Sequence, residues 1–519
     1  MNRDEMLGSV EDFKGKWDFI IIGGGATGLG TAIEAASRGY KTLLLEQSDF
    51  AKGTSSRSTK LVHGGVRYLK QGNLSLVLEA LKERGILRRN APHLVHDLPF
   101  VVPTYDWWEG PFYGIGLKLY DALAGKEGFG SSKILSKEET LKHIPTIETK
   151  GLRGGVIYYD GQFDDARLSI NMAETAFEQG ATLINYLKVT SLLKDEGQIV
   201  GVEAVNMETN KKYKLNTKVV INATGVFSDS IRKMDDKSVK NIITSSQGVH
   251  IVLPKSFLPG DSAIMVPETD DDRVLFAIPW HNRILIGTTE TPVNEYLIDP
   301  VPLKEEIDFL LKHAAKYLTK DPKRSDILSL FAGLRPLVKS GDEENTAAIS
   351  RDHTINISRS GLVTITGGKW TTYRKMAEDT IDHAAVLAHL DPELSVTKEL
   401  GIHGYHNHSE EFGNLQIYGS DATAIKALIR EDESYKKLLH PDFSTVTGEV
   451  IWAVKYEMAR TVEDFLARRT RLLLLDAKAS IKIAPAVAKL MAKELNKNKK
   501  WIKDQVNNFN EVARKYVVS

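Results

Sequence analysis

The stretch WDFIIIGGGATGLGTAIEAASRGYKTLLLEQ, residues 17–47, decides the fold class. An unbroken apolar run leads into three glycines, and an alanine-rich segment then leads into a second apolar run that ends at Glu46. Continuous apolar strands are typical of parallel sheets that are covered on both faces, and Gly39 is typical of a helix C-terminus. We therefore predict a strand, a tight turn, a helix and a second strand, which form a βαβ unit at the start of an α/β fold.

The turn of this unit carries a dinucleotide-binding fingerprint. Residues 23–28 fit the pattern G-x-G-x-x-G, and Glu46 follows Gly28 by 18 residues, close to the expected spacing of about 20. Such glycines make the turn, admit a pyrophosphate to the backbone amides and allow helix–strand contact, while the helix N-terminus adds positive partial charge. Glu46 would accept hydrogen bonds from ribose and repel a 2′-phosphate, which argues against NADP. A tight turn without a ligand is the alternative.

Two later segments favour FAD over NAD. KVVINATGVFSDS, residues 218–230, is a further strand that ends in Ala223-Thr224-Gly225, and LVTITGGKWTTYRKMAEDT, residues 362–380, reads as a strand, two glycines and a helix. A helix N-terminus aimed at the flavin pyrimidine would stabilise the anionic reduced ring. Lys369, at that turn, could add a full charge. An enzyme that binds NAD does not need segments this late in the chain to return to the first domain.

Composition removes several functional classes. The 519 residues hold 68 Lys plus Arg and 68 Asp plus Glu, for a net charge of zero, and no cysteine. A chain-wide basic field for nucleic acid is absent, and disulfides, cysteine-ligated metals and thiol nucleophiles are excluded. We predict no metal site. The polar N-terminus does not resemble a secretory signal, and no apolar run reaches the length of about 18 residues that a transmembrane helix needs.

The remaining chain reads as strands and helices with a helical end. We expect helices over 74–90, 164–179, 303–318 and 370–388. Expected strands cover 182–186, 198–205, 211–215, 218–222, 248–253, 273–279, 283–288 and 361–368. Residues 98–120 are aromatic and apolar but broken by Pro and Gly. After residue 400 the segments 421–431, 447–457, 461–467, 477–495 and 499–515 predict an all-helical C-terminal domain.

An ordered set of motifs identifies a family resemblance. The motifs are IIGGGATGLG, TSSRSTKLVHGGVRYL, DDARL, INATGVFSDS, SQGVHIVLP, PWHNRILIGTTE, FAGLRPLV, ISRDHTI and GGKWTTYRKMAE. In this order they resemble the FAD-dependent glycerol-3-phosphate dehydrogenases, over roughly residues 15–400 and the helical tail. The resemblance implies non-covalent FAD, oxidation of sn-glycerol 3-phosphate to dihydroxyacetone phosphate, and transfer of electrons to a membrane quinone. Close relatives are oxidases that use oxygen.

The fold that the resemblance implies is α/β, and α+β overall. A Rossmann-type FAD-binding domain of glutathione-reductase type, as in D-amino-acid-oxidase-like flavoproteins, would interleave with an antiparallel-sheet substrate domain. We divide the chain into an FAD-binding domain of residues 1–80, 150–240 and 340–395, a substrate-binding domain of residues 81–149 and 241–339, and a helical C-terminal domain of residues 400–519.

Arginines suit the dianionic phosphate of such a substrate, because a guanidinium matches phosphate geometry. Arg67 follows two glycines, Arg335 lies in GLRPL and Arg351 lies in SRDHT. Surface ion pairs are the alternative for each of them. The resemblance assigns substrate contacts to Arg67, Tyr68, His250, Arg335, Arg351 and Lys369.

The resemblance also extends the FAD site beyond the first unit. The full set of cofactor-binding candidates is Gly23, Gly25, Ala26, Thr27, Gly28, Glu46, Ser55, Ser56, Thr59, Lys60, Leu61, His63, Gly64, Gly65, Val189, Ala223, Thr224, Gly225, Gly333, Gly367, Gly368, Lys369, Trp370 and Thr371. We expect Gly64 and Gly65 to let the backbone approach the isoalloxazine.

Hydride transfer from C2 to flavin N5 requires a base for the hydroxyl proton, and histidine suits this near neutral pH. The candidates are His63 and His250, with His281 and His353 weaker. We favour His63, and assign Arg335 and Lys369 as the other catalytic residues. Arg335 would position the hydroxyl and its developing negative charge. In the same basic loop we expect Arg57 and Lys70 to be plain surface charges.

The electron acceptor and the location depend on weaker signals. The chain has no long insertion of the kind that some oxidases carry, which favours the quinone-linked dehydrogenase over the oxidase. A flavin-binding module that has lost catalysis is the third reading. The tail lacks an Asp-rich calcium loop. Residues 98–120 and 466–475 mix aromatic or leucine residues with cations, as membrane-interface segments do, and ordinary core is the alternative for both. We expect attachment to the cytoplasmic face of the cell membrane, and the resemblance allows a homodimer.

Overall fold

The computed structural model describes residues 1–65, 73–267, 269–270, 273–338 and 352–518. The predicted βαβ unit is confirmed as β1 (Trp17–Ile22), α2 (Ala26–Ser37) and β2 (Thr42–Leu45). Every residue of β1 is buried, as its apolar run requires. The unit lies in an eight-stranded sheet in the order β17-β18-β10-β1-β2-β7, and β18, β10, β1, β2 and β7 pair in parallel.

Strand β10 (Lys212–Asn222) corrects the prediction of two strands over 211–215 and 218–222. Its first half alternates exposed and buried residues and pairs antiparallel with β9, and its second half is buried and pairs in parallel with β1. Thr217 joins the halves, since its hydroxyl donates to the Trp17 carbonyl at 3.2 Å. The polar residues between the apolar runs therefore mark a change of neighbours rather than a break.

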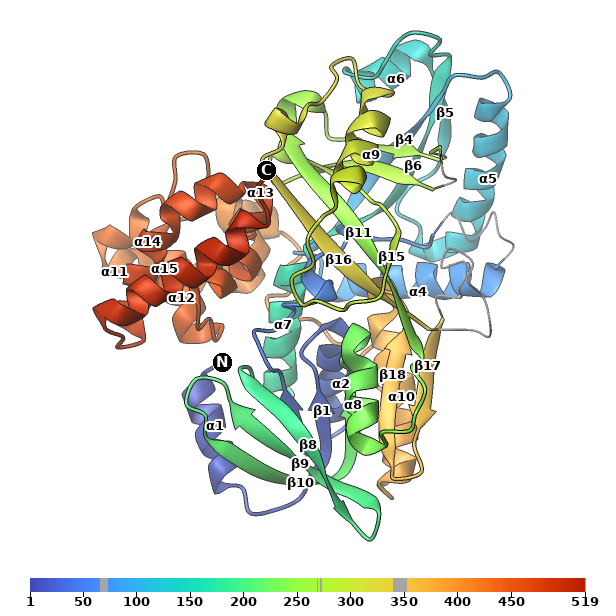
Figure 1. Ribbon diagram of the computed structural model, residues 1–519. Coiled ribbons are helices and arrows are strands. Elements are labelled where there is room, and N and C mark those ends of the chain that lie inside the picture. Colours follow the sequence, from blue (N-terminus) through green and yellow to red (C-terminus); the bar gives the residue numbers. More distant parts are fainter. Residues whose placement is uncertain (66–72, 268, 271–272, 339–351, 519) are drawn as a thin grey trace.

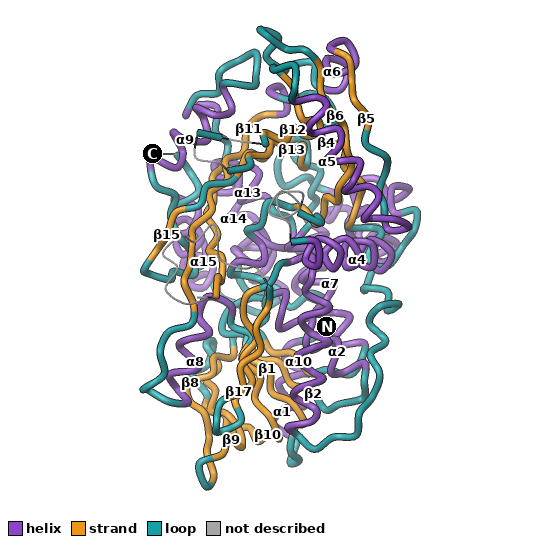
Figure 2. The backbone as a smooth tube through the Cα atoms, turned by 90° about the vertical axis from the view of Figure 1, so that its right-hand side faces the viewer, coloured by secondary structure: helices purple, strands orange, loops and turns teal. Residues whose placement is uncertain are grey.

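A second, ten-stranded sheet runs in the order β15-β11-β14-β13-β12-β4-β6-β3, with β16 paired to β11 and β5 paired to β6. The longest ladder joins β11 (Ile243–Pro254) to β16 (Ser329–Val338) in antiparallel register. Figure 2 shows the strands of the two sheets at opposite ends of the molecule, with α4 (Leu74–Asn90) between them. Strand β6 (Gly154–Phe163) pairs with β4 in the second sheet. Our domain division stays a prediction.

Among the other elements, α7, α9, α10, β7, β9, β13, β14 and β18 match predicted segments, and the rest were not predicted. The helices are α1 (Arg3–Asp12), α6 (Lys137–His143), α7 (Asp165–Glu178), α8 (Ser228–Asp235), α9 (Lys304–Ala315) and α10 (Tyr373–Leu387). The strands are β3 (Leu61–Val62), β4 (Val95–Thr104), β5 (Lys133–Ser136), β7 (Thr182–Ile184), β8 (Leu187–Asp195), β9 (Gln198–Asn206), β12 (Ala263–Val266), β13 (Leu275–Trp280), β14 (Arg283–Gly287), β15 (Thr291–Val293), β17 (His353–Ile357) and β18 (Leu362–Gly367).

The predicted helical C-terminal domain is confirmed (Figure 1). It contains α11 (Ala422–Glu431), α12 (Thr447–Tyr456), α13 (Leu472–Leu475), α14 (Ala477–Glu494) and α15 (Lys499–Arg514). Residues 464–469 form a π-helical turn before α13. All residues of 466–475 are buried, so the membrane-interface reading of that segment is wrong and the core reading holds.

Residues 98–120 divide into the end of β4 and most of α5 (Glu109–Ala124). Pro111 causes no break because it stands in the first turn of α5, where a missing amide hydrogen costs little. Tyr120 is buried, but Trp107 is 77% exposed and Ile115 is 74% exposed. Core is therefore the wrong reading for the outer face of this helix. Among the described residues, no helix is both long enough and apolar enough to cross a membrane.

Candidate functional site

The predicted cofactor residues meet at one edge of the parallel sheet. Gly23 follows β1, Glu46 follows β2, Ala223 follows β10, and Gly367 ends β18. The carboxyl ends of parallel strands meet at the same edge, where open α/β sheets bind their ligands. The sheet order thus brings together four segments that lie up to 344 positions apart in the sequence.

The fingerprint glycines are required by close backbone contacts. Gly23 has φ +109°, and a Cβ on it would lie 2.7 Å from the Ala223 carbonyl oxygen. A Cβ on Gly28 would lie 1.9 Å from the Gly23 carbonyl oxygen. Gly25, the N-cap residue of α2, has no side chain that could cap the helix. Backbone amides at a helix N-terminus suit a pyrophosphate, so the residues present fit FAD.

Glu46 is tied to the glycine loop. Its carboxylate accepts hydrogen bonds from the amides of Gly24 at 2.7 Å and Ser48 at 2.8 Å. Burial raises the pKa of Glu46, and these two amides oppose the rise. Each carboxylate oxygen can accept a second hydrogen bond, so a ribose contact remains a prediction that the geometry allows.

The segment after the first unit packs across the site. The Ser55 hydroxyl accepts from the Ala26 amide at 2.9 Å, and the Ser55 carbonyl accepts from the Trp370 indole at 2.9 Å. The Thr371 hydroxyl accepts from the His63 amide at 3.3 Å. Three segments that we predicted to bind FAD are therefore held together by direct hydrogen bonds.

The late glycine turn is also confirmed as a turn. Gly367 has φ +78° and Gly368 has φ +74°, values that favour glycine. Lys369 then precedes a short 3₁₀ turn, which continues into α10. The Nζ of Lys369 is buried. Gly225 opens the corresponding turn after β10 with φ +57°. Val189 is buried in β8 and pairs with Ala204. Its contact with FAD stays a prediction.

Some residues of the basic loop have structural partners. Lys60 is fully buried, and its Nζ lies 2.7 Å from the Asp165 carboxylate and 2.8 Å from the Ser56 carbonyl. Arg57 is 6% exposed and pairs with Asp299. The prediction that Arg57 is a plain surface charge was wrong. No local pattern indicates its partner, which lies 242 residues away in the sequence.

Gly64 has a packing role within the protein. Its amide donates to the Tyr120 hydroxyl at 2.8 Å, and a Cβ on it would lie 2.6 Å from both that oxygen and a Leu81 methyl. A Cβ on Gly333 would likewise lie 3.0 Å from the Arg57 carbonyl oxygen. Gly65 has φ +82°. Approach to the isoalloxazine stays a prediction for these glycines, while contact with protein atoms already explains two of them.

Arg335 and His250 lie on one face of the β11–β16 ladder. Arg335 is opposite Ser246 and His250 is opposite Phe331, and alternate residues of a strand share a face. The Arg335 guanidinium donates to the Ser246 and Thr288 hydroxyls, each at 3.3 Å, and to the Thr289 carbonyl at 3.1 Å. Its plane is thereby oriented from β11 and from the loop between β14 and β15.

His250 is held as a neutral ring. It is 3% exposed, stacks on Phe331 at 4.9 Å between ring centroids, and its Nε2 lies 3.0 Å from the Thr59 hydroxyl. Burial, together with the charges of Lys60 and Arg335, lowers the pKa of His250 well below its ordinary value. A base that must accept a proton needs this neutral form.

Two glycines around this pair were missed by the sequence analysis. A Cβ on Gly248 would lie 2.6 Å from Arg335 Nη2, and a Cβ on Gly287 would lie 2.1 Å from the His250 ring. The sequence does hold a signal for both glycines, because a glycine inside a strand pattern indicates that another group approaches the backbone closely.

The weaker histidine candidates are engaged elsewhere. His281 Nε2 lies 3.1 Å from Asp164, and His353 Nε2 lies 2.9 Å from Asp379. Arg67, Tyr68 and Arg351 fall outside the described residues, as does Lys70. The substrate roles of the first three and the surface role of Lys70 remain predictions.

Comparisons with known proteins agree with this site. Residues 18–374 match the family described as FAD dependent oxidoreductase, and residues 363–502 match the C-terminal domain of alpha-glycerophosphate oxidase. The mitochondrial glycerol-3-phosphate dehydrogenase of Mus musculus is 41% identical over 516 residues, which cover 93% of this chain and 71% of the mouse protein. The mitochondrial enzyme of Schizosaccharomyces pombe is 36% identical over 583 residues, which cover 99% of this chain and 89% of the yeast protein.

A solved structure extends the similarity to the whole fold. The glycerol-3-phosphate dehydrogenase from Bacillus halodurans, in complex with FAD, superposes with a TM-score of 0.81 at 30% identity and covers 99% of this chain and 98% of that one. The glycine-lined edge and these matches together identify a flavin-dependent oxidoreductase whose cofactor is FAD, and the chain belongs to the family of FAD-dependent glycerol-3-phosphate dehydrogenases.

Proposed function

We propose that the chain oxidises sn-glycerol 3-phosphate to dihydroxyacetone phosphate. The observation that carries the proposal is the pairing of an oriented guanidinium, Arg335, with a neutral buried imidazole, His250, on one face of the β11–β16 ladder. Bound flavin supplies the acceptor for the hydride that leaves C2 of the substrate. The protein has to bind the phosphate, orient the hydroxyl and take up its proton.

Arg335 suits the orienting task. Ser246, Thr288 and Thr289 take up part of its hydrogen-bonding capacity and fix the plane of the guanidinium. Donors that are fixed in advance stabilise negative charge as it develops on the substrate oxygen. We assign phosphate and hydroxyl contacts to Arg67, Tyr68, His250, Arg335, Arg351 and Lys369.

His63 remains our proposed base for the hydroxyl proton. Its backbone is anchored at Thr371, directly after the Lys369 turn, and its side chain is only partly buried. The alternative is His250, whose pKa keeps it neutral. We expect His63→Ala to lower the rate of flavin reduction by roughly a hundredfold or more, the usual contribution of a general base, with FAD retained.

Stopped-flow reduction of the two variants His63→Ala and His250→Ala separates the candidates. Near-normal reduction in His63→Ala together with a large loss in His250→Ala would transfer the role of base to His250. The exposed His408 lies outside the site, so His408→Ala is the control and should reduce at the rate of the unaltered protein.

We propose a membrane quinone as the electron acceptor, as the family resemblance implies. Molecular oxygen is the second candidate, because residues 363–502 match a domain that takes its name from an oxidase. After anaerobic reduction by glycerol 3-phosphate, the chosen acceptor should reoxidise the flavin. Fast reoxidation by a soluble quinone analogue, with little hydrogen peroxide in air, supports the dehydrogenase, whereas stoichiometric peroxide supports the oxidase.

We further propose that the α5 patch binds the surface of a phospholipid bilayer at the cytoplasmic face of the cell membrane. The patch comprises Trp107, Trp108, Phe112, Ile115, Leu119 and Ile134, all exposed. Phe112, Ile115 and Leu119 lie on α5, Trp107 and Trp108 directly precede it, and Ile134 lies on β5. Exposed aromatic and aliphatic residues beside a cation such as Lys118 are typical of interfacial helices. In Figure 1, α5 lies on the far side of the sheets from the C-terminal helices, so a bilayer at α5 would not meet that domain. A homodimer remains compatible with this arrangement.

The patch is tested with anionic phospholipid vesicles in a flotation assay. Ile115→Glu should reduce vesicle binding while the rate of flavin reduction is unchanged. Val386→Glu is the matched control, because Val386 is 76% exposed on α10 and outside the patch. Equal flotation of both variants would rule out docking through α5.

A further inference from the structure

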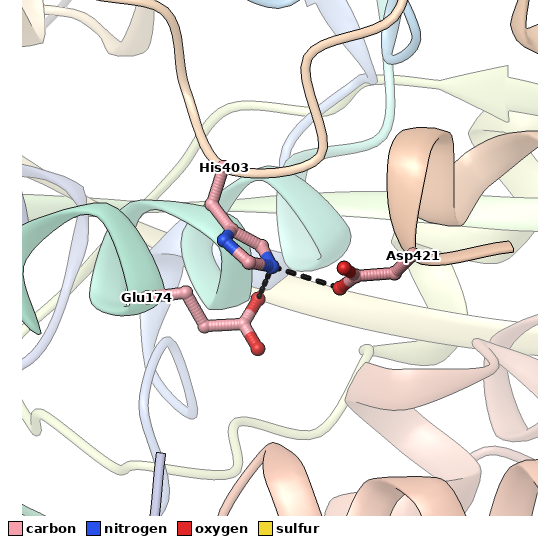
Figure 3. A group of neighbouring side chains, drawn as sticks. All are labelled: Glu174, His403 and Asp421. Carbon is pink, nitrogen blue, oxygen red and sulfur yellow. Dashed lines mark hydrogen bonds and ion pairs between the residues drawn. The ribbon is translucent and has the colours of Figure 1, made fainter. Parts of the chain in front are cut away.

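A second cluster of chemically active side chains gathers around His403. His403, in the segment between α10 and α11, meets three carboxylates. Its Nδ1 lies 2.6 Å from Glu178 Oε1, and its Nε2 lies 2.8 Å from Asp421 Oδ2 and 3.6 Å from Glu174 Oε2. Figure 3 shows Glu174 and Asp421 converging on this one nitrogen from α7 and from the start of α11.

The backbone on both sides of His403 is fixed. Its amide donates to the Thr175 hydroxyl at 2.8 Å, and its carbonyl accepts from the Asn171 side chain at 2.7 Å. Gly404 and Gly419 cross so closely that a Cβ on Gly419 would lie 1.7 Å from the Gly404 carbonyl oxygen. The imidazole is therefore presented to the two carboxylates by a rigid crossing of chain segments.

The cluster holds more negative charge than its own cation can balance. Glu174, Glu178 and Asp421 are three carboxylates around one imidazole. The nearby Arg167 is paired with Glu457 at 2.8 Å. Glu174 is 5% exposed, and its carboxylate lies 3.6 Å from His403 Nε2. A buried carboxylate in such a place is stabilised either by a proton or by a further cation.

The spacing of the three ligand atoms fits a tetrahedral ion. Zinc binds imidazole nitrogen and carboxylate oxygen at about 2.0–2.2 Å, which separates neighbouring ligand atoms by roughly 3.3 Å. The two measured separations from Nε2, 2.8 and 3.6 Å, lie on either side of that value. The ligand atoms of Glu174, His403 and Asp421 all lie within 4.8 Å of one another.

Glu178 completes a recognisable arrangement around the histidine. Histidines that bind metals usually donate their other ring N–H to a carboxylate, which fixes the tautomer and leaves the ligating nitrogen basic. Here Nδ1 faces Glu178 while Nε2 faces the other two carboxylates. The same residues thus supply three ligands and the carboxylate that orients one of them.

We propose that Glu174, His403 and Asp421 bind a zinc ion that joins α7 to the C-terminal helical domain. Water would complete the tetrahedron. On binding, Nε2 gives up the proton that it donates to Asp421 in the absence of metal, and that proton is released to solvent. The role of this zinc is structural and does not depend on the proposed substrate. A ligand that binds only the folded state raises the stability of that state.

Zinc binding is measured on the FAD-loaded enzyme after dialysis against a chelator. Zinc chloride alone is the titrant, in calorimetry and in thermal unfolding, and bound metal is counted by mass spectrometry. The unaltered enzyme should bind one zinc per chain and unfold at a higher temperature with zinc. His403→Gln and Glu174→Gln should lose stoichiometric binding, and Glu178→Gln should bind roughly 10- to 100-fold more weakly.

A histidine outside the cluster provides the control for zinc binding. His408→Gln removes an exposed histidine of the same segment, 3.5 Å from Glu410, and should bind zinc like the unaltered enzyme. Absence of stoichiometric zinc in the unaltered enzyme, or equal zinc binding in Glu178→Gln and His408→Gln, would overturn the site. Since Glu178 lies outside the ligand set, its variant keeps the test decisive even if His403→Gln does not fold.

Discussion

At the scale of single residues, reactivity depends on how the β11–β16 ladder presents Arg335 and His250. The guanidinium is oriented by two hydroxyls and a carbonyl, and the imidazole by Thr59 and Phe331. Glycine at positions 248 and 287 gives both side chains the room they occupy. Geometry that is fixed before substrate binds does not have to be created during the reaction.

Replacement of Arg335 by lysine tests the fork geometry. Arg335→Lys keeps the charge but loses the planar set of donors, so we expect flavin reduction by glycerol 3-phosphate to slow by about 100-fold or more, as when a preorganised donor is removed. FAD content should stay normal. Arg324→Lys, at an exposed arginine that pairs with Asp308 at 2.7 Å, is the control. Unchanged reduction in Arg335→Lys would remove Arg335 from the chemistry.

The lowered pKa of His250 makes a prediction about stability. Its folded-state pKa lies below the ordinary value of 6.5, so below pH 6.5 the unfolded chain binds a proton that the folded chain does not. Stability should therefore fall as the pH decreases from 6.5, by about 1.4 kcal/mol per pH unit for one proton. His250→Gln should show a correspondingly shallower slope in urea unfolding between pH 6.5 and 5. Identical slopes would refute this account of the ring.

Prediction from sequence succeeded at the residue scale wherever the signal was local. The glycines of residues 23–28 and 367–368 carry their own conformational signature. Arg57 was misjudged because its burial depends on Asp299, a partner distant in the sequence. His403 passed unnoticed for the same reason, since Glu174 and Asp421 reach it only through the fold.

At the scale of elements, the parallel strands bring the FAD residues to one edge, and the turn after β1 sets how closely α2 can approach. Gly28 is the tightest point, where a Cβ would lie 1.9 Å from the Gly23 carbonyl oxygen. The first turn of α2 cannot keep its position if that contact is broken.

We expect Gly28→Ala to abolish FAD retention, because the added methyl group forces the glycine loop away from the helix N-terminus. The FAD-to-protein ratio after purification, read from absorbance, is the measurement. Gly8→Ala is the matched control, since a Cβ on Gly8 in α1 meets nothing within 4 Å. Full FAD content in Gly28→Ala would contradict the close packing that we describe.

The hydrophobic pattern predicted many of the elements but not, for example, β6, β16 and α5. Two of its misreadings have identifiable physical causes. Strand β10 serves two different neighbours, so its pattern changes from alternating to continuous within one element. Residues 466–475 resemble an interfacial helix, but the arginines there are buried by carboxylates that lie elsewhere in the chain. Composition cannot distinguish a cation that faces lipid headgroups from one that faces a buried aspartate.

At the scale of the whole molecule, a buried network of charges joins the C-terminal domain to the cofactor edge. Asp49, just after β2, lies 2.5 Å from Arg468 and 2.6 Å from Arg469. All three side chains are buried. Burial would raise the pKa of Asp49, but the two arginines outweigh it and lower that pKa to about 2. The helical domain is thus attached next to the loop that holds Glu46.

Asp49→Asn should destabilise the protein by about 3 kcal/mol, because it removes the carboxylate that two buried guanidinium groups share. Arg468 keeps Glu463 at 3.0 Å and Asp464 at 2.8 Å, which limits the loss. Since the folded-state pKa of Asp49 is depressed to about 2, the stabilisation it provides is present above about pH 4 and is lost between pH 4 and 2. Chemical denaturation at pH 7 measures the loss. Asp261→Asn, at a fully exposed carboxylate, should change stability by less than about 0.5 kcal/mol. A similarly small effect of Asp49→Asn would rule out the network as an anchor.

The central claim is that this fold uses its FAD to oxidise glycerol 3-phosphate, and the flavin spectrum tests it most directly. The purified FAD-loaded protein is mixed in a stopped-flow instrument, without oxygen, with glycerol 3-phosphate or with glycerol at equal concentration. We predict that glycerol 3-phosphate bleaches the flavin absorbance band and that glycerol, which lacks the phosphate that arginine recognises, does so far more slowly. An unchanged flavin band with glycerol 3-phosphate, or equal rates with both compounds, would contradict the account.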